Sequence, residues 1–163
     1  MCIRRYYMIE SLKALLADWK ETRSITLTFL NELSDADLDK PLPRKKLNTI
    51  RLQAYELTLF QRDIVGSLGT DKLSYEEEYI YNNLPTQDII KRMKELDSQF
   101  EKALESLSGT ETMDYYGEEK NVHQIIAMMS GHEQMHIGQI IAFCYATGIE
   151  IPESISEPMA LEG

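Results

Sequence analysis

The chain has 163 residues, a formal net charge of −10 and a sequence pI of about 4.8. This length predicts a single domain over residues 1–163. So acidic a chain repels phosphate backbones, which argues against nucleic acid as a partner. No apolar run approaches the roughly 20 residues that span a bilayer, and two cysteines are too few for a disulfide scaffold. A cytoplasmic protein that does not enter the membrane is therefore expected.

Apolar residues at three- and four-residue steps predict a first helix over residues 8–33. A connection that contains two prolines follows it. The second helix is expected to begin near Asn48 or Thr49, both favourable N-cap residues, and to stop at Gly69. Residues 70–84 mix tyrosines with glutamates and predict an irregular crossover that includes a helical turn.

A third helix is predicted from an N-cap at Thr86 to Gly109, with a regular apolar stripe. Residues 112–120 are expected to form a small hairpin-like loop around Gly117. The next apolar stripe predicts a fourth helix that starts after Asn121.

The fourth helix is expected to run to Thr147, with Gly148 as the left-handed residue that follows it. Residues 151–163 read as a C-terminal tail that crosses a surface or frays. Strand-like alternation is almost absent. The predicted fold class is therefore all-α, a four-helix bundle with one long crossover connection.

The most informative motif is H-E-x-x-H, formed by His132, Glu133 and His136 within the fourth helix. Four residues of helix turn through about 400°, so the two histidines lie about 40° apart on the apolar face. Two imidazoles placed in this way can reach one metal ion. A pair of hydrogen-bonded core histidines is the alternative.

A third protein ligand must come from another helix. The remaining histidine, His123, lies about half a turn away around the helix, and Cys144 lies roughly two turns beyond His136.

Glu56 is the leading candidate for that ligand, since apolar residues three and four positions away place it at the border of the core. A half-exposed salt-bridge residue is the alternative interpretation of Glu56. Weaker candidates are Asp63, Glu95 and Asp97.

The motif also raises the hypothesis of a zinc metalloprotease, with Glu133 as the base that acts on a metal-bound water. Only a short segment with prolines follows His136, and no strand is predicted that would offer an edge to a peptide. Proteolysis is therefore the least favoured of the functions considered.

The stretch from His132 to Gln139, followed by Gly148 to Pro152, resembles the signature of the DinB-like superfamily, a group of bacterial four-helix bundles. The start of the second helix, Thr49-Ile50-Arg51, is similar to the corresponding helix start in that family. Residues 29–38 are similar to the end of its first helix. The resemblance thus covers nearly the whole chain.

This resemblance implies a divalent metal, zinc or nickel among others, held by three histidines. Two of them map onto His132 and His136. The third, counted seven residues from Thr49, maps onto Glu56, so that glutamate stands where histidine is usual. Two histidines and a glutamate can form a catalytic zinc set. The alternative is a site that has been lost.

Some members of the family are thiol transferases that use bacillithiol, mycothiol or glutathione. The resemblance therefore implies a transferase that joins a low-molecular-weight thiol to small electrophiles in detoxification or stress response, with a homodimer as the usual assembly. The alternative is a non-catalytic metal-binding or dimerising stress protein. Around such a site, Gln139 would orient a ligand or a histidine, with helix packing as the alternative. Tyr55 and Phe60 would wall the pocket, with a place in the apolar core as the default interpretation.

Overall fold

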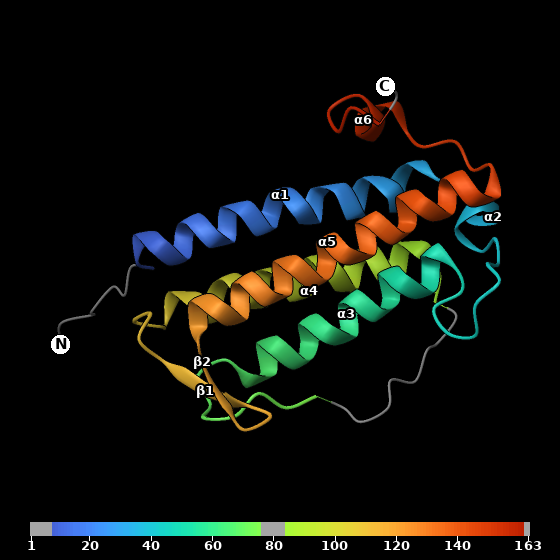
Figure 1. Cartoon of the computed structure of the whole chain (residues 1–163). Coiled ribbons are helices and arrows are strands. Elements are labelled where there is room, and N and C mark those ends of the chain that lie inside the picture. Colours follow the sequence, from blue (N-terminus) through green and yellow to red (C-terminus); the bar gives the residue numbers. More distant parts are fainter. Residues whose placement is uncertain (1–7, 76–83, 162–163) are drawn as a thin grey trace.

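The computed structural model describes residues 8–75 and 84–161 and confirms the all-α four-helix bundle (Figure 1). The long helices are α1 (Glu10–Glu32), α3 (Ile50–Ser67), α4 (Thr86–Glu105) and α5 (Val122–Thr147). Two short helices are α2 (Asp35–Leu38) and α6 (Glu153–Ser156), and a two-stranded antiparallel sheet joins β1 (Thr112–Tyr115) to β2 (Glu118–Asn121). Within these described residues, none of the helices combines the length and apolar character that a bilayer crossing requires.

Along the chain, the directions of the four long helices follow an up, down, down, up order. Figure 1 shows α1 and α5 running in one direction and α3 and α4 in the other. α1 packs on α5 and α4, and α3 packs on the same two helices. A long crossover is needed between α3 and α4 because they are parallel. Residues 76–83 of that crossover, where a helical turn was expected, lie outside the described residues.

Local capping explains where the helices that carry the site begin. The Thr49 side chain accepts a hydrogen bond from the Leu52 amide at the start of α3. Asn121 and Gln124 form a reciprocal capping box at the start of α5. Gly148, at φ 67°, ends α5 in the left-handed conformation. These boundaries agree with those that the sequence predicts.

The expected N-cap at Thr86 is wrong, because Pro85 occupies the cap position of α4. The Thr86 side chain is instead buried between helices, where it donates to Asp35 Oδ1 at 2.6 Å and accepts from Arg51. Arg51 also pairs with Asp35 and Asp39. The Thr86 hydroxyl therefore makes a tertiary contact and does not cap α4.

The C-terminal tail crosses the bundle surface and does not fray within the described residues. Ile151 and Ile155 are buried in the same apolar cluster as residues of α1 and α3. α6 lies against α1, and Ser154 Oγ donates to Glu32 Oε1 at 2.9 Å.

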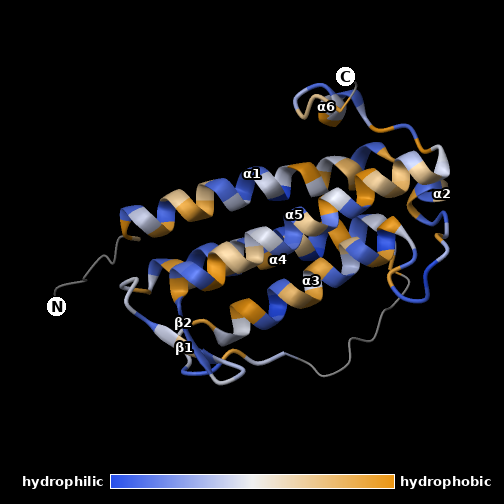
Figure 2. Cartoon of the chain, in the orientation of Figure 1, coloured by the Kyte–Doolittle hydropathy of each residue, from blue (hydrophilic) through white to orange (hydrophobic). Residues whose placement is uncertain are grey.

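The core consists of two apolar clusters, one at each end of the bundle, with hydrophobic residues recurring along all four long helices (Figure 2). A layer of buried polar side chains separates these clusters. The buried members of this polar layer are Arg23 from α1, Glu56 and Gln61 from α3, and Glu133 and His136 from α5, and the partly exposed Asp97 of α4 completes it. Such groups are stable in a core only if they find partners.

We predict that Ile155→Ala lowers the free energy of unfolding by about 2–4 kcal/mol, because it leaves a cavity in a closed core. Met159→Ala is the matched control in the same segment, since Met159 is 39% exposed, and its effect should stay within about 0.5 kcal/mol. Urea unfolding followed by circular dichroism measures both. Equal, small effects would contradict the packing of the tail.

Candidate metal centre

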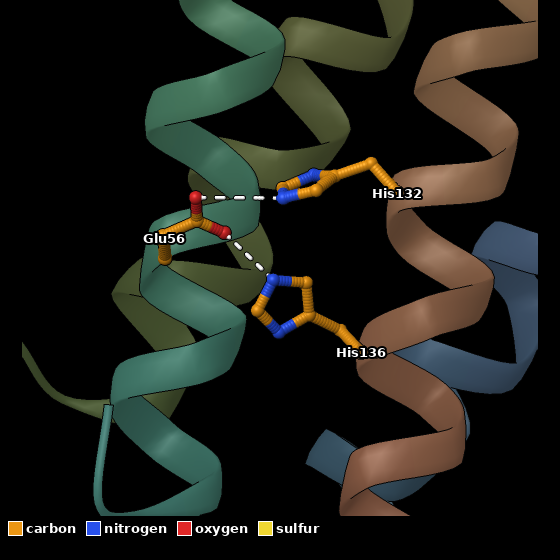
Figure 3. A group of neighbouring side chains, drawn as sticks. All are labelled: Glu56, His132 and His136. Carbon is orange, nitrogen blue, oxygen red and sulfur yellow. Dashed lines mark ion pairs between the residues drawn. The ribbon is translucent and has the colours of Figure 1, made fainter. Parts of the chain in front are cut away.

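The three residues singled out by the sequence lie together in the middle of the bundle. α5 presents His132 and His136 toward α3, and the Glu56 carboxylate points between the two imidazoles (Figure 3). Glu56 Oε1 lies 3.6 Å from His132 Nε2, and Glu56 Oε2 lies 3.0 Å from His136 Nε2. The three candidate ligand atoms lie within 4.8 Å of one another, the one such cluster among the described residues.

The exposed fractions of the three side chains differ, and this difference shows which side of the site is more open to solvent. The side chain of His136 is 2% exposed and that of Glu56 is 10% exposed. The side chain of His132 is 19% exposed, so the group is closed on the His136 side and more open beside His132. A small ligand would therefore approach next to His132.

Gln53, one turn before Glu56 on α3, holds the far side of the His136 ring. Its Oε1 lies 3.2 Å from His136 Nδ1, so the ring donates its Nδ1 proton there. In the neutral ring, the lone pair is then on Nε2, the nitrogen that faces Glu56. This second hydrogen bond fixes the tautomer and orientation that a metal-ligating histidine requires.

Two buried polar atoms of this group lack hydrogen-bond partners among the described residues. Glu56 Oε2, which lies close to His136 Nε2, is one of them, and the other is His132 Nδ1, on the His132 ring whose Nε2 faces Glu56. A carboxylate oxygen that faces an imidazole lone pair is repelled unless a cation or proton lies between them. Two nitrogens and a carboxylate oxygen are a suitable ligand set for a divalent ion, so these residues fit a metal.

The electrostatics keep His132 in the form that binds metals. Burial lowers the pKa of His132, and the neighbouring His136 lowers it further, while the Glu56 carboxylate opposes both effects. The imidazole is therefore neutral at physiological pH, which is the state that donates a lone pair.

Glu133 does not face this group. Its carboxylate accepts hydrogen bonds from Trp19 Nε1 at 3.1 Å and from Thr26 Oγ1 at 2.7 Å, and it lies 3.3 Å from Arg23 Nη2. All three partners belong to α1. Burial raises the pKa of Glu133, and the Arg23 charge opposes the rise. A carboxylate engaged in this way has a structural role and does not sit beside the two histidines as a base.

Arg23 extends this contact to the other two helices. Its Nε lies 3.5 Å from Asp97 Oδ1 on α4, and its Nη2 donates to Gln61 Oε1 on α3 at 2.8 Å. Gln61 in turn donates to Asp97 at 2.9 Å. Arg23 was not among the residues predicted from the sequence, although its position four residues after Trp19 and three before Thr26 places it on the buried stripe of α1.

The other candidate ligands lie elsewhere. Asp63 pairs with Arg62 at 2.6 Å, Asp97 belongs to the Arg23 contacts, and Glu95 lies 4.0 Å from Lys91 on an exposed face. His123 contacts Ser11 at the other end of the bundle from Gly148. None of them joins the triad.

Of the three residues expected around the site, Phe60 lies beside it, whereas Tyr55 and Gln139 make their contacts elsewhere. The Phe60 ring lies 4.0 Å from the His132 ring between centroids, so Phe60 does wall the site. Tyr55 is 4% exposed and belongs to the apolar core. Gln139 accepts a hydrogen bond from Arg44 Nη1 at 3.1 Å, which directs its amide oxygen toward the α2–α3 connection.

We predict that Cys144 is almost unreactive in the folded protein. It is fully buried, and burial raises the pKa of its thiol to about 11. Because the thiolate is the reactive form, alkylation by iodoacetamide at pH 8 should be at least ~100-fold slower than in urea. The measurement uses a Cys2→Ser background so that Cys144 is the remaining thiol. Equal rates in the two states would contradict this environment.

Comparison with known proteins adds one match. Residues 19–140 match the family model described as the DinB superfamily. This span includes most of α1, all of α3 and α4, and the part of α5 that carries both histidines. The sequence matches no curated protein.

Proposed function

The chain belongs to the DinB superfamily, and on this basis we propose that Glu56, His132 and His136 hold a divalent metal ion, zinc or nickel. We further propose that the protein is a metal-dependent transferase that joins a low-molecular-weight thiol to a small electrophile. The observation that carries this proposal is the convergence of ligand atoms from Glu56, His132 and His136 within 4.8 Å of one another, with the buried Glu56 Oε2 lacking a hydrogen-bond partner among the described residues.

The chemistry follows from the ligand set. Three protein ligands leave coordination positions open, and a divalent cation there favours the thiolate form of a thiol. The thiolate sulfur forms a C–S bond with an electrophilic carbon as the bond to a leaving group or an epoxide oxygen breaks. Gln53 orients His136 for this task, and Phe60 excludes water from one side of His132.

A second hypothesis is a non-catalytic metal-binding or dimerising stress protein with the same scaffold. The glutamate at position 56, where the resemblance implies histidine, is the observation that favours it. A homodimer and a small-molecule substrate remain predictions from the resemblance. Proteolysis is disfavoured, since the Glu133 carboxylate is bonded to α1.

We predict near-stoichiometric zinc or nickel, by elemental analysis, in untagged protein purified without chelators. His132→Ala and His136→Ala should remove the metal, and Glu56→Ala should weaken its binding at least ~10-fold because a charged ligand is lost. His123→Ala is the matched control and should retain the metal, since His123 instead contacts Ser11. Unchanged metal content in Glu56→Ala would exclude Glu56 as a ligand.

The Glu56→His variant separates the two main hypotheses. Metal in the natural protein, together with thiol conjugation detected by mass spectrometry in a screen of thiols against electrophiles, supports the transferase. A natural protein without metal, whose Glu56→His variant takes it up, would show that Glu56 has disabled the site. The non-catalytic hypothesis would then lead.

We predict that Gln53→Leu weakens metal binding by about 10- to 100-fold, because it removes the acceptor that orients His136. Competition with a chromogenic chelator measures the affinity. Gln139→Leu is the control on the neighbouring turn of α5 and should leave the affinity unchanged, since Gln139 is bonded to Arg44. Equal affinities in the natural protein and Gln53→Leu would remove Gln53 from the site.

A further inference from the structure

The outward face of α5 carries no charged residue. α5 packs mainly against α1 and α3, and the rest of its surface faces solvent (Figure 1). Its exposed residues have small, apolar or amide side chains: Gln124, Ala127, Gly131, Gln134, Met135, Gly138, Ala142, Tyr145 and Ala146. At 100° per residue, these positions fall within about 120° of the helix circumference. We call these nine residues the uncharged face of α5.

The exposed faces of α1 and α4 have a different composition. Of the nine exposed residues of α4, six are charged, namely Asp88, Lys91, Lys94, Glu95, Lys102 and Glu105. Of the eleven exposed residues of α1, six are charged, namely Glu10, Lys13, Asp18, Lys20, Glu21 and Glu32. A helix at the surface normally places charged residues on the side that faces solvent. The sequence of α5 is therefore typical of a helix that is covered on every side.

Packing within one chain does not account for two features of this face. Met135 and Tyr145 are 49% and 57% exposed, and they are two of the four exposed large apolar side chains among the described residues. Gly131 and Gly138 lie inside the helix without a positive φ, and an added Cβ at either would meet nothing within 4 Å. Alanine is favoured over glycine in helix interiors, so a single chain gains nothing from these glycines. Glycine does allow another backbone to approach closely.

We propose that the uncharged face of α5 binds the same face of a second copy of this chain. Each copy carries a charge of −10, and a two-fold contact brings the same surface of both copies together, so acidic groups within it would repel. The uncharged face avoids this repulsion and buries Met135 and Tyr145. Charge also argues against other occupants, because a basic partner is attracted to acidic surfaces and an anionic lipid surface repels this chain.

The second copy lies beside the metal-ligand group in this arrangement. His132 comes three residues before Met135, so the two side chains point about 60° apart around α5. The His132 side chain is 19% exposed, on the more open side of the group. A partner helix packed on Met135 therefore narrows the approach to His132. The proposed function includes a homodimer, and this inference goes beyond it by naming the surface, which requires neither the metal nor thiol conjugation.

Sedimentation equilibrium of the full chain tests this contact. The natural protein should form a reversible dimer with twice the 18.8 kDa mass of one chain. Gly131→Glu and Met135→Glu should each raise the Kd of the dimer at least ~10-fold, because like charges then meet in the contact. Gln99→Glu is the matched control, since it adds the same charge at an exposed position of α4, and it should leave the Kd unchanged.

Both α5 variants should retain the fold of the single chain. A side chain at position 131 enters open space, Met135 is half exposed, and glutamate is a better helix former than glycine. Far-UV circular dichroism of each variant measures the helix content. A natural protein that is monomeric at about 100 μM would overturn the proposal. A dimer whose Kd is unchanged in both folded variants would overturn it as well.

Failure of the proposed function has a different outcome. The sedimentation experiment is repeated on metal-loaded and on chelator-treated protein. A dimer in both states, together with no thiol conjugation, supports the contact and removes the transferase. A monomer that binds metal and conjugates thiols overturns the contact and leaves the transferase in place.

Discussion

The contact between Arg23 and Glu133 is the constraint on which the rest of the structure depends. A buried charge is costly unless it is paired, so α5 must turn Glu133 toward α1. Neighbouring residues of a helix point about 100° apart, and this rotation directs His132 and His136 toward α3. Glu133, the second residue of the H-E-x-x-H motif, therefore sets the direction of the two histidines. Proteolytic chemistry would need Glu133 to face the other way.

The parts of the fold that follow from local patterns could be predicted from the sequence. The four helices, the caps at Thr49 and Asn121, and the position of Glu56 beside apolar neighbours all have local signals. The features that could not be predicted from the sequence depend on tertiary contacts. The Thr86 hydroxyl bonds to Asp35 instead of capping α4. A charged residue on an apolar stripe, such as Arg23, carries no local signal that identifies the helix it will contact.

The carboxylate at position 56 changes the electrostatics of the group that it completes. Two neutral histidines and one glutamate would leave a divalent ion with a residual charge of about +1, whereas three histidines would leave about +2. The polar layer adds two further carboxylates, those of Asp97 and Glu133, against the single guanidinium of Arg23. If the site binds a metal as proposed, this environment would favour the cation and would attract anionic ligands less than a three-histidine site.

The pairing of the first long helix with the last has a consequence for the order in which the protein assembles. Trp19 and Glu133 are bonded across 114 residues of chain. During synthesis, α1 must wait for α5 before it can bury its stripe, and contacts between such distant segments form slowly. The α3 half of the site is made early and the α5 half arrives late. The nascent chain is therefore most exposed to aggregation just before its last long helix emerges.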